Sequence, residues 1–300
     1  MVEYAKKICK RLHAYLRGGH HTGMIRLITP GSMRLETDIG VVSILSNTSC
    51  LQPFSMIVNE TKPFTESDLV EGQRVELDEE RILFVDSEAI LDVSQATDMD
   101  LSIDVLRSLF LPLDINNRVR LLIRSVEDNA GTSALAGLAT GAEIDASCEP
   151  VKRELAFLHQ TVYEQSLAEC HEAGSRLAGF GNGATPDSDD MLEGYFAGYA
   201  ALSAALGRSM ERVRSMTREI AAGAAERTTD LSAALLLQAG EGLISEDMLH
   251  LLQSLFSDVP YRTVVMYANR VAKSEAPSGT NLLVGVAAAI QYHYVPARIL

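Results

Sequence analysis

The segment from Gly179 to Gly194 combines residues that can bind an anion with residues that can accept a proton. It reads Gly-Phe-Gly-Asn-Gly-Ala-Thr-Pro-Asp-Ser-Asp-Asp-Met-Leu-Glu-Gly, so three alternating glycines precede a Thr-Pro helix start and a pair of carboxylates. A glycine-rich loop that leads into a helix presents unpaired backbone N–H groups beside the positive end of the helix dipole. Such a helix start binds anions, and carboxylates one turn further on can hold a metal or a polar substrate.

A second, weaker copy of this pattern occurs near the C-terminus, as Pro-Ser-Gly-Thr-Asn-Leu-Leu-Val-Gly at 277–285. Both copies fit Pro-x-x-x-[Asp/Asn]-x-Leu-x-Gly, with Asp190 and Asn281 at the same position of the motif. The shared pattern predicts that the loops 179–190 and 278–281 lie side by side, both at helix N-termini and facing one cavity. A single small anion would then meet several convergent N–H donors.

Asp190 is the first candidate for a catalytic residue and its neighbour Asp189 is the second. A carboxylate there can orient an amino group or accept its proton. Asp187 lies one turn before Asp190 at i,i+3 and could act with it. The candidates for binding substrate or an anion are Gly181, Gly183, Thr185, Arg227, Thr228, Thr229, Ser278, Gly279 and Asn281.

Each of these features also has a purely structural explanation. In the first loop Gly179 can be a helix C-cap and Thr185 an N-cap, with the acidic residues complementing the helix dipole. Ser278 and Thr228 can likewise serve only to start their helices, and Arg227 can be an ordinary surface arginine. The three alternating glycines next to two adjacent acids favour function, because glycine in a loop costs conformational entropy.

Composition limits the classes of function. The chain has 300 residues, 26 basic and 40 acidic, for a net charge of −14. Such a chain repels polyphosphates, so nucleic acid is excluded as an expected partner. The four scattered cysteines form no C-x-x-C pair, and no metal site is predicted from them. No signal peptide and no membrane-length apolar segment is found, which predicts a cytoplasmic protein.

The chain changes pattern along its length, which predicts an α+β protein. An antiparallel β-rich barrel or sandwich is expected at 1–95, a partly helical connector at 96–149 and a helical bundle at 150–300. The predicted strands are 24–28, 32–36, 41–45, 54–58, 74–77 and 81–85.

Apolar periodicity and alanine-rich segments predict helices throughout the last part. One amphipathic helix is expected from Pro150 to Gly179, and the next is expected to begin at Thr185-Pro186. Gly194 and Gly198 on that second helix would let a neighbouring helix approach closely. Further helices are predicted at 209–225, 228–241, 245–256, 261–273 and 278–292.

These motifs resemble those of the AllH family, described as a subunit of oxamate carbamoyltransferase in anaerobic allantoin breakdown. The central family segment, G-x-G-x-G-x-T-P-x-x-D-D-x-L-x-G, matches Gly179 through Gly194. A Thr-Thr-x-x-Ser signature matches 228–232, and a Ser-Gly-x-Asp-x-Leu-x-Gly signature matches 278–285. The resemblance extends from about residue 22 to 293, including a Pro-Phe element at 53–54.

The sequence departs from the family pattern at two places. Asn281 stands where the family has Asp, and Ala276-Pro277 stands where His-Thr can precede the Ser-Gly pair. No general base is therefore carried over to that position. The Ser-Thr-Arg-Thr-Arg phosphate motif of ordinary carbamoyltransferases is also absent from the chain.

The resemblance implies transfer of a carbamoyl group to or from phosphate, with oxamate or a related amide or ureido compound as substrate. It implies FdrA-like and other carbamoyltransferase subunits as partners. It implies no certain cofactor and leaves open whether a divalent metal is bound. One alternative is a non-catalytic subunit that binds substrate or holds an assembly together. The other is a metal-dependent hydrolase built on Asp189 and Asp190. The sequence leaves the acceptor, the oligomeric state and the identity of the base open.

Overall fold

The computed structural model describes residues 2–59, 62–87, 89–106, 108–274 and 278–294. The chain divides into two compact units, Met1–Leu101 and Ser102–Leu300. The first unit is built of strands and the second of helices, so the predicted α+β fold class is confirmed.

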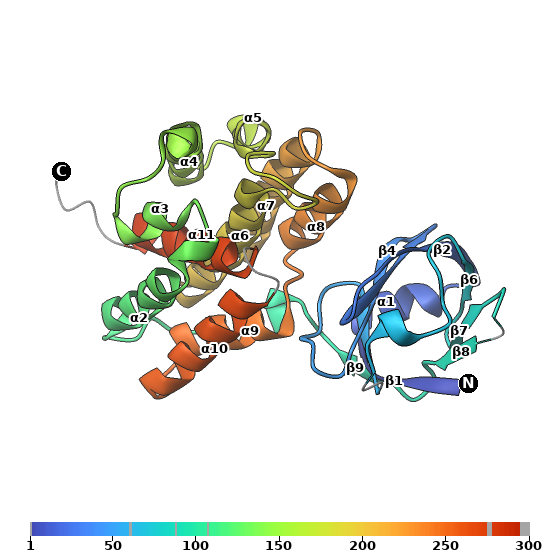
Figure 1. Ribbon diagram of the computed structural model, residues 1–300. Coiled ribbons are helices and arrows are strands. Elements are labelled where there is room, and N and C mark those ends of the chain that lie inside the picture. Colours follow the sequence, from blue (N-terminus) through green and yellow to red (C-terminus); the bar gives the residue numbers. More distant parts are fainter. Residues whose placement is uncertain (1, 60–61, 88, 107, 275–277, 295–300) are drawn as a thin grey trace. The chain divides into compact units, whose positions relative to one another are not determined.

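The first unit is an eight-stranded β-barrel with one additional strand (blue to cyan in Figure 1). The neighbour order is β5-β4-β3-β2-β6-β7-β8-β1-β9, and a further pairing of β5 with β1 closes the barrel. The strands are β1 (Val2–Cys9), β2 (His21–Ile28), β3 (Ser32–Thr37), β4 (Gly40–Leu45), β5 (Ser55–Val58), β6 (Arg74–Leu77), β7 (Arg81–Phe84), β8 (Ala89–Asp92) and β9 (Thr97–Met99). Two short helices join them, α1 (Lys10–Leu16) and η1 (Phe64–Glu66).

The inside of the barrel is filled by alternate side chains of its strands. In β3, for example, Met33 and Leu35 are buried, and in β7 Ile82 and Phe84 are buried. This period of two is the pattern expected of strands with one buried face. All four residues of β5 are buried. An eight-stranded barrel leaves just enough interior for side chains or for one small ligand.

Three strands were missing from the sequence prediction. β8 and β9 are short, and β1 has Lys6 and Lys7 in its middle, which obscure its apolar alternation. β1 nevertheless closes the barrel, antiparallel to β5 and parallel to β8 and β9. β4 and β5 are also parallel, because the loop between them returns the chain to the same end of the barrel. The expectation of a wholly antiparallel sheet was therefore too simple.

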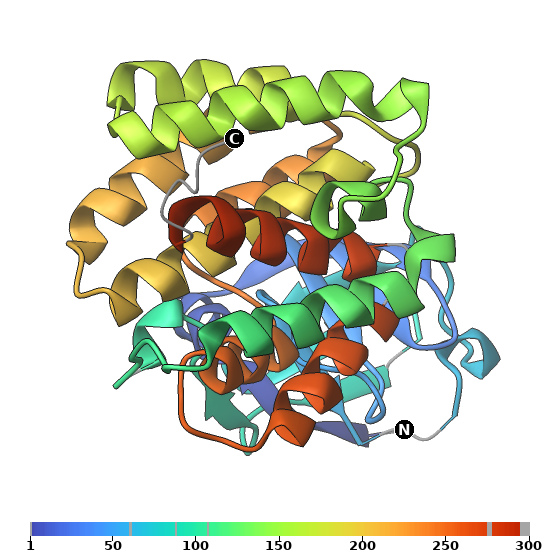
Figure 2. The ribbon, with the colours of Figure 1, turned by 90° about the vertical axis from the view of Figure 1, so that its left-hand side faces the viewer.

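The second unit contains helices of very different character. They are η2 (Ile103–Val105), α2 (Ile115–Asp128), η3 (Ala130–Thr132), α3 (Ala136–Thr140), η4 (Ala146–Cys148), α4 (Glu149–Glu164), α5 (Leu167–Leu177), α6 (Asp187–Ala205), α7 (Met210–Ala225), α8 (Asp230–Gly240), α9 (Glu246–Leu255), α10 (Tyr261–Lys273) and α11 (Ser278–Tyr294). α6 and α11 are buried on most of their surface, and Figure 2 shows α11 (red) passing through the middle of this unit. Helices that are apolar all round belong in the core, so these two form its centre.

The single helix expected between Pro150 and Gly179 is in fact two. The chain breaks at Gln165, whose φ of 55° is left-handed and ends α4. Ser166 then precedes α5, which ends at Leu177. Gly179 follows with a φ of 82°, the left-handed conformation that terminates many helices.

Candidate functional site

The two copies of the Pro-x-x-x-[Asp/Asn]-x-Leu-x-Gly motif start the two central helices, which pack on each other reciprocally. A Cβ atom added to Gly194 of α6 would lie 1.9 Å from the carbonyl oxygen of Leu282. A Cβ atom added to Gly285 of α11 would lie 1.9 Å from the carbonyl oxygen of Met191. These positions are equivalent in the two motif copies, so the crossing has an internal twofold character. Pro277, the first residue of the second copy, lies outside the described residues.

This crossing brings the two helix starts into direct contact. The Thr185 and Ser278 hydroxyl oxygens are 3.3 Å apart, and Asn281 Nδ2 donates a hydrogen bond of 2.9 Å to Asp187 Oδ1. Thr185 does not cap α6 as expected, because Pro186 occupies the N-cap position. Its hydroxyl instead faces the other helix start.

Asp190 lies between these groups with an unsatisfied carboxyl oxygen. Its side chain is 4% exposed, and Oδ2 has no hydrogen-bond partner within the described part of the chain. The pKa of Asp190 is raised to about 7, chiefly by burial, and the negative charges of Asp187 and Asp189 contribute to the rise. Hydrogen bonds from Ser278 and Asn281 act in the opposite direction and do not outweigh burial. A carboxyl group with a pKa near neutrality can either donate or accept a proton.

Asp189, the other predicted catalytic residue, is bound on both oxygens by donors of the protein. Oδ1 accepts a hydrogen bond of 2.7 Å from the Gly179 backbone N–H. Oδ2 accepts hydrogen bonds from the Thr228 hydroxyl and, at 2.6 Å, from the Ser232 hydroxyl. The side chain is fully buried. Asp189 thus connects the start of α6 to the glycine-rich loop and to the start of α8.

The glycine-rich loop leaves a stretch of backbone exposed above these carboxylates. Residues 181–184 are exposed, and their N–H groups donate no hydrogen bond to another described residue. Gly181 has a φ of 120°, and a Cβ atom there would lie 2.5 Å from the Asp187 backbone nitrogen. Gly183 has a φ of 92° with open space around it. Only glycine adopts such angles at no steric cost, so the loop shape depends on these two residues.

The remaining predicted binding residues fall into two groups. Thr229 caps α8 through Ser232 N–H, and its hydroxyl also donates to the Ala184 carbonyl oxygen at 2.5 Å. It therefore fixes the glycine-rich loop, as Thr228 fixes Asp189. Arg227 is exposed just before them, and no described residue forms an ion pair with it. A Cβ atom on Gly279 would lie 2.0 Å from the Val271 carbonyl oxygen, so this glycine permits close packing of α10.

Sequence reasoning missed one member of the site. Ser133 is buried and donates a hydrogen bond of 2.5 Å to Asn281 Oδ1, while its own oxygen accepts from the Leu135 N–H. It follows η3 in a segment without any motif, so no local pattern could have identified it. Nearby, the Thr132 and Thr280 hydroxyl oxygens are 3.1 Å apart. Asn281 is therefore held on both sides of its amide, by Ser133 and by Asp187.

Residues 177–290 match the AllH family. The family model is described as oxamate carbamoyltransferase subunit AllH. The matched region contains every residue predicted for the site, from Gly181 to Asn281, which confirms the resemblance for this part of the chain. No curated protein and no solved structure matches the chain. The family name describes a subunit of an enzyme.

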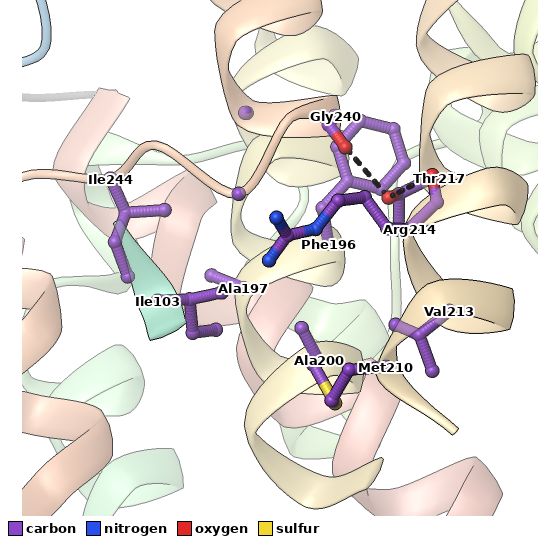
Figure 3. A pocket seen from close by; sticks show the side chains of 12 residues that line it. Ile103, Phe196, Ala197, Ala200, Met210, Val213, Arg214, Thr217, Gly240 and Ile244 are labelled. Carbon is purple, nitrogen blue, oxygen red and sulfur yellow. Dashed lines mark hydrogen bonds between the residues drawn. The ribbon is translucent and has the colours of Figure 1, made fainter. Parts of the chain in front are cut away.

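The AllH region also borders a narrow pocket among α6, α7, η2 and the end of α8 (Figure 3). Its volume of about 10 Å³ accommodates one water molecule at most. Within it the Thr217 hydroxyl already donates to the Gly240 carbonyl oxygen at 2.8 Å, and Arg214 pairs with Asp104. This pocket is too small for a substrate.

The described residues show neither a metal-ligand cluster nor a membrane span. They contain no group of three or more His, Cys, Asp or Glu side chains arranged to hold a metal ion. None of their helices has both the length and the apolar character needed to cross a bilayer.

Proposed function

We propose that this chain is a subunit of a carbamoyltransferase that acts on oxamate or a related amide or ureido compound. The match to AllH supports the class of reaction and its setting in allantoin breakdown. The observation that supports a chemical role for this chain is the buried Asp190 carboxyl, with one unpartnered oxygen between two helix starts.

In the proposed reaction Asp190 accepts a proton from the attacking nitrogen. The nitrogen lone pair forms a bond to the carbonyl carbon of carbamoyl phosphate, and the bond from that carbon to the phosphate oxygen breaks. Phosphate leaves with the electron pair, while one proton of the nitrogen passes to the Asp190 carboxylate. A pKa near 7 suits this transfer, because a base works best when its pKa is near the operating pH.

The exposed N–H groups of residues 181–184 are the proposed site for the phosphate group. They lie at the N-terminus of α6, where the helix dipole favours an anion. Arg227 is the proposed cation for a carboxylate or phosphate, since a guanidinium binds such groups with two parallel hydrogen bonds. We propose that Asp189, Thr228 and Thr229 position the loop, because their polar atoms are already bonded to it.

The proposal is tested with Asp190→Asn in the reconstituted complex. Carbamoyl transfer from carbamoyl phosphate to oxamate is expected to fall about a hundredfold or more, as for loss of a general base. The matched control is Asp230→Asn, which removes an exposed carboxylate from the first turn of α8. A complex with Asp190→Asn that turns over at the rate of the control would remove Asp190 from the mechanism.

A non-catalytic role is the second candidate, and one observation favours it. Asp189 has both oxygens bonded within the protein and Asn281 carries no charge, so of the two predicted catalytic carboxyls only Asp190 has an open oxygen. A subunit that only binds substrate or supports assembly needs no base. In that case turnover is lost when the subunit is left out of the complex but is preserved by Asp190→Asn. Isothermal titration of oxamate into the chain then distinguishes a substrate-binding subunit, which binds oxamate, from one that only supports assembly.

A further inference from the structure

The barrel unit contains a cavity far larger than any packing defect. Its volume is about 260 Å³, and it is lined by inward-facing residues of β1, β3, β4, β5, β7 and β8 and by the segment 62–69. Native interiors have few voids larger than one water molecule. An apolar cavity of roughly 150 Å³ already binds benzene, so this one has room for a ring and a short polar arm.

The walls and the rim of this cavity differ in chemistry. The walls are apolar, and the buried side chains that form them are Met33, Ile44, Val58, Phe64, Phe84 and Leu91. The rim is charged. Among the residues that the structure describes, it has three carboxylates, on Glu3, Glu66 and Asp68, and one ammonium group, on Lys62.

The balance of charge at the rim selects the kind of ligand. The described lining residues therefore place two net negative charges beside the opening, three carboxylates against one ammonium group. Glu66 and Asp68 are exposed, and neither forms an ion pair with a described residue. A positive group at the opening would therefore gain attraction from both carboxylates.

We propose that the mouth of the barrel binds a small organic cation, an ammonium or amidinium group on an apolar or aromatic body. The apolar part occupies the space between Met33, Ile44 and Phe84, and the positive group lies at the rim near Glu66 and Asp68. Barrel mouths are common places for such pockets, because the inward-facing side chains already form the walls. This site is separate from the helical unit, and it stands whether or not the carbamoyltransferase function is correct.

The test uses the full chain labelled with carbon-13 at the methionine methyl groups. Met33 lines the cavity and reports binding, whereas Met266, exposed on α10, serves as the internal control. The probes are benzylamine, benzyl alcohol and benzoate, which share a ring and differ in charge. Benzylamine is expected to shift the Met33 signal at the lowest concentration and benzoate at the highest, with Met266 unmoved.

Two variants make the result specific to the rim and to the cavity. Glu66→Gln with Asp68→Asn is expected to weaken benzylamine about threefold to tenfold and to leave benzyl alcohol unchanged. The control, Glu79→Gln with Glu80→Gln, removes the same charge from the exposed β6–β7 turn and is expected to preserve binding. Ala89→Leu fills the cavity from a half-buried position and is expected to abolish binding of all three probes.

Three results would overturn the proposal. One is an unmoved Met33 signal with every probe at millimolar concentration. The second is benzoate binding as tightly as benzylamine, which would show an apolar cavity without charge selection. The third is equal loss of benzylamine affinity in the Glu66/Asp68 variant and in the Glu79/Glu80 control, which would show only the effect of net charge.

Discussion

Two adjacent carboxylates of one motif have opposite surroundings in this protein. Asp189 receives hydrogen bonds on both oxygens, from a backbone N–H and from hydroxyl groups. Asp190 is almost equally buried, yet one of its oxygens has no partner in the described residues. Burying a polar group without a hydrogen bond costs free energy. A buried carboxyl oxygen without a protein partner is therefore typical of a position that binds a ligand.

We expect the two carboxylates to respond differently to amide substitution. Asp189→Asn replaces an acceptor oxygen by a donor that faces other donors, and should lower the free energy of unfolding by about 2–4 kcal/mol. Asp190→Asn removes a buried carboxyl that has one oxygen without a partner, so its unfolding free energy should stay within about 1 kcal/mol of wild type or rise. Urea unfolding at pH 7 measures both, with Asp230→Asn as the exposed control. Equal losses in the two variants would contradict this assignment of roles.

The raised pKa of Asp190 also predicts a pH dependence. Its folded-state pKa is about 7 against an ordinary value of 3.8, so between these values the folded chain holds a proton that the unfolded chain has released. This contribution to stability is full below about pH 4 and is lost as the pH rises to 7, by about 1.4 kcal/mol for each pH unit at most. The stability of Asp190→Asn relative to wild type should therefore increase from pH 4 to 7. A constant difference would show that Asp190 titrates normally.

At the scale of elements, the crossing of α6 and α11 decides the geometry of the site. Gly194 and Gly285 let each helix backbone approach the other, with the carbonyl oxygens of Leu282 and Met191 where a Cβ would stand. The same crossing places Asn281 against Asp187 and Ser278 against Thr185. The prediction that Gly194 permits close helix packing is confirmed by this contact.

Alanine at either glycine should force the two helices apart. Gly194→Ala and Gly285→Ala are each expected to lower the free energy of unfolding by about 3 kcal/mol, since overpacking a tight backbone contact cannot relax locally. Gly131→Ala is the control, because a Cβ there meets no atom within 4 Å. Thermal unfolding of the three variants provides the comparison, and unchanged melting temperatures for Gly194→Ala and Gly285→Ala would refute the close crossing.

At the scale of the whole molecule, a second buried polar group links α4, α6 and α11 within the helical unit. The Tyr195 hydroxyl lies 3.1 Å from His159 Nδ1 and 2.7 Å from His293 Nε2. Burial lowers the pKa of His159 to about 3 and that of His293 to about 4. Both rings are therefore neutral at pH 7, and the hydroxyl donates to one ring while it accepts from the other.

These histidines should make the protein sensitive to acid. An unfolded histidine takes up a proton near pH 6.5, whereas the buried rings do not, so stability falls as the pH drops from 6.5 toward 4. Each histidine contributes a slope of about 1.4 kcal/mol per pH unit at most, opposite in sign to that of Asp190. His159→Gln should reduce this slope in unfolding experiments between pH 7 and 5. His250→Gln, an exposed control, should preserve it; equal slopes in all three proteins would contradict the assignment.

The sequence by itself determined the class of fold and the positions of most helices. Five predicted helices match α7 to α11 within a few residues at each end. Apolar periodicity and alanine content depend on residues that are close in the sequence, because one face of a helix is buried and the other exposed. They therefore predict helices from the sequence alone. The break at Gln165 was missed because its left-handed backbone follows no residue signal, Gln being an ordinary helix former.

Only the tertiary structure decided what each polar residue of the motif does. The partners of Asp189 and Asn281 come from distant segments: Ser232, 43 positions away, and Ser133, 148 positions away. No local pattern encodes such pairs, because hydrogen bonds between separate elements depend on how the helices cross. The same holds for β1. Its lysines interrupt the apolar alternation along the sequence, and its role as a strand is evident only from its pairing with β5 where the barrel closes. The motif supplied two adjacent carboxylates, and the packing of α6, α8 and α11 satisfied one and left an oxygen of the other open.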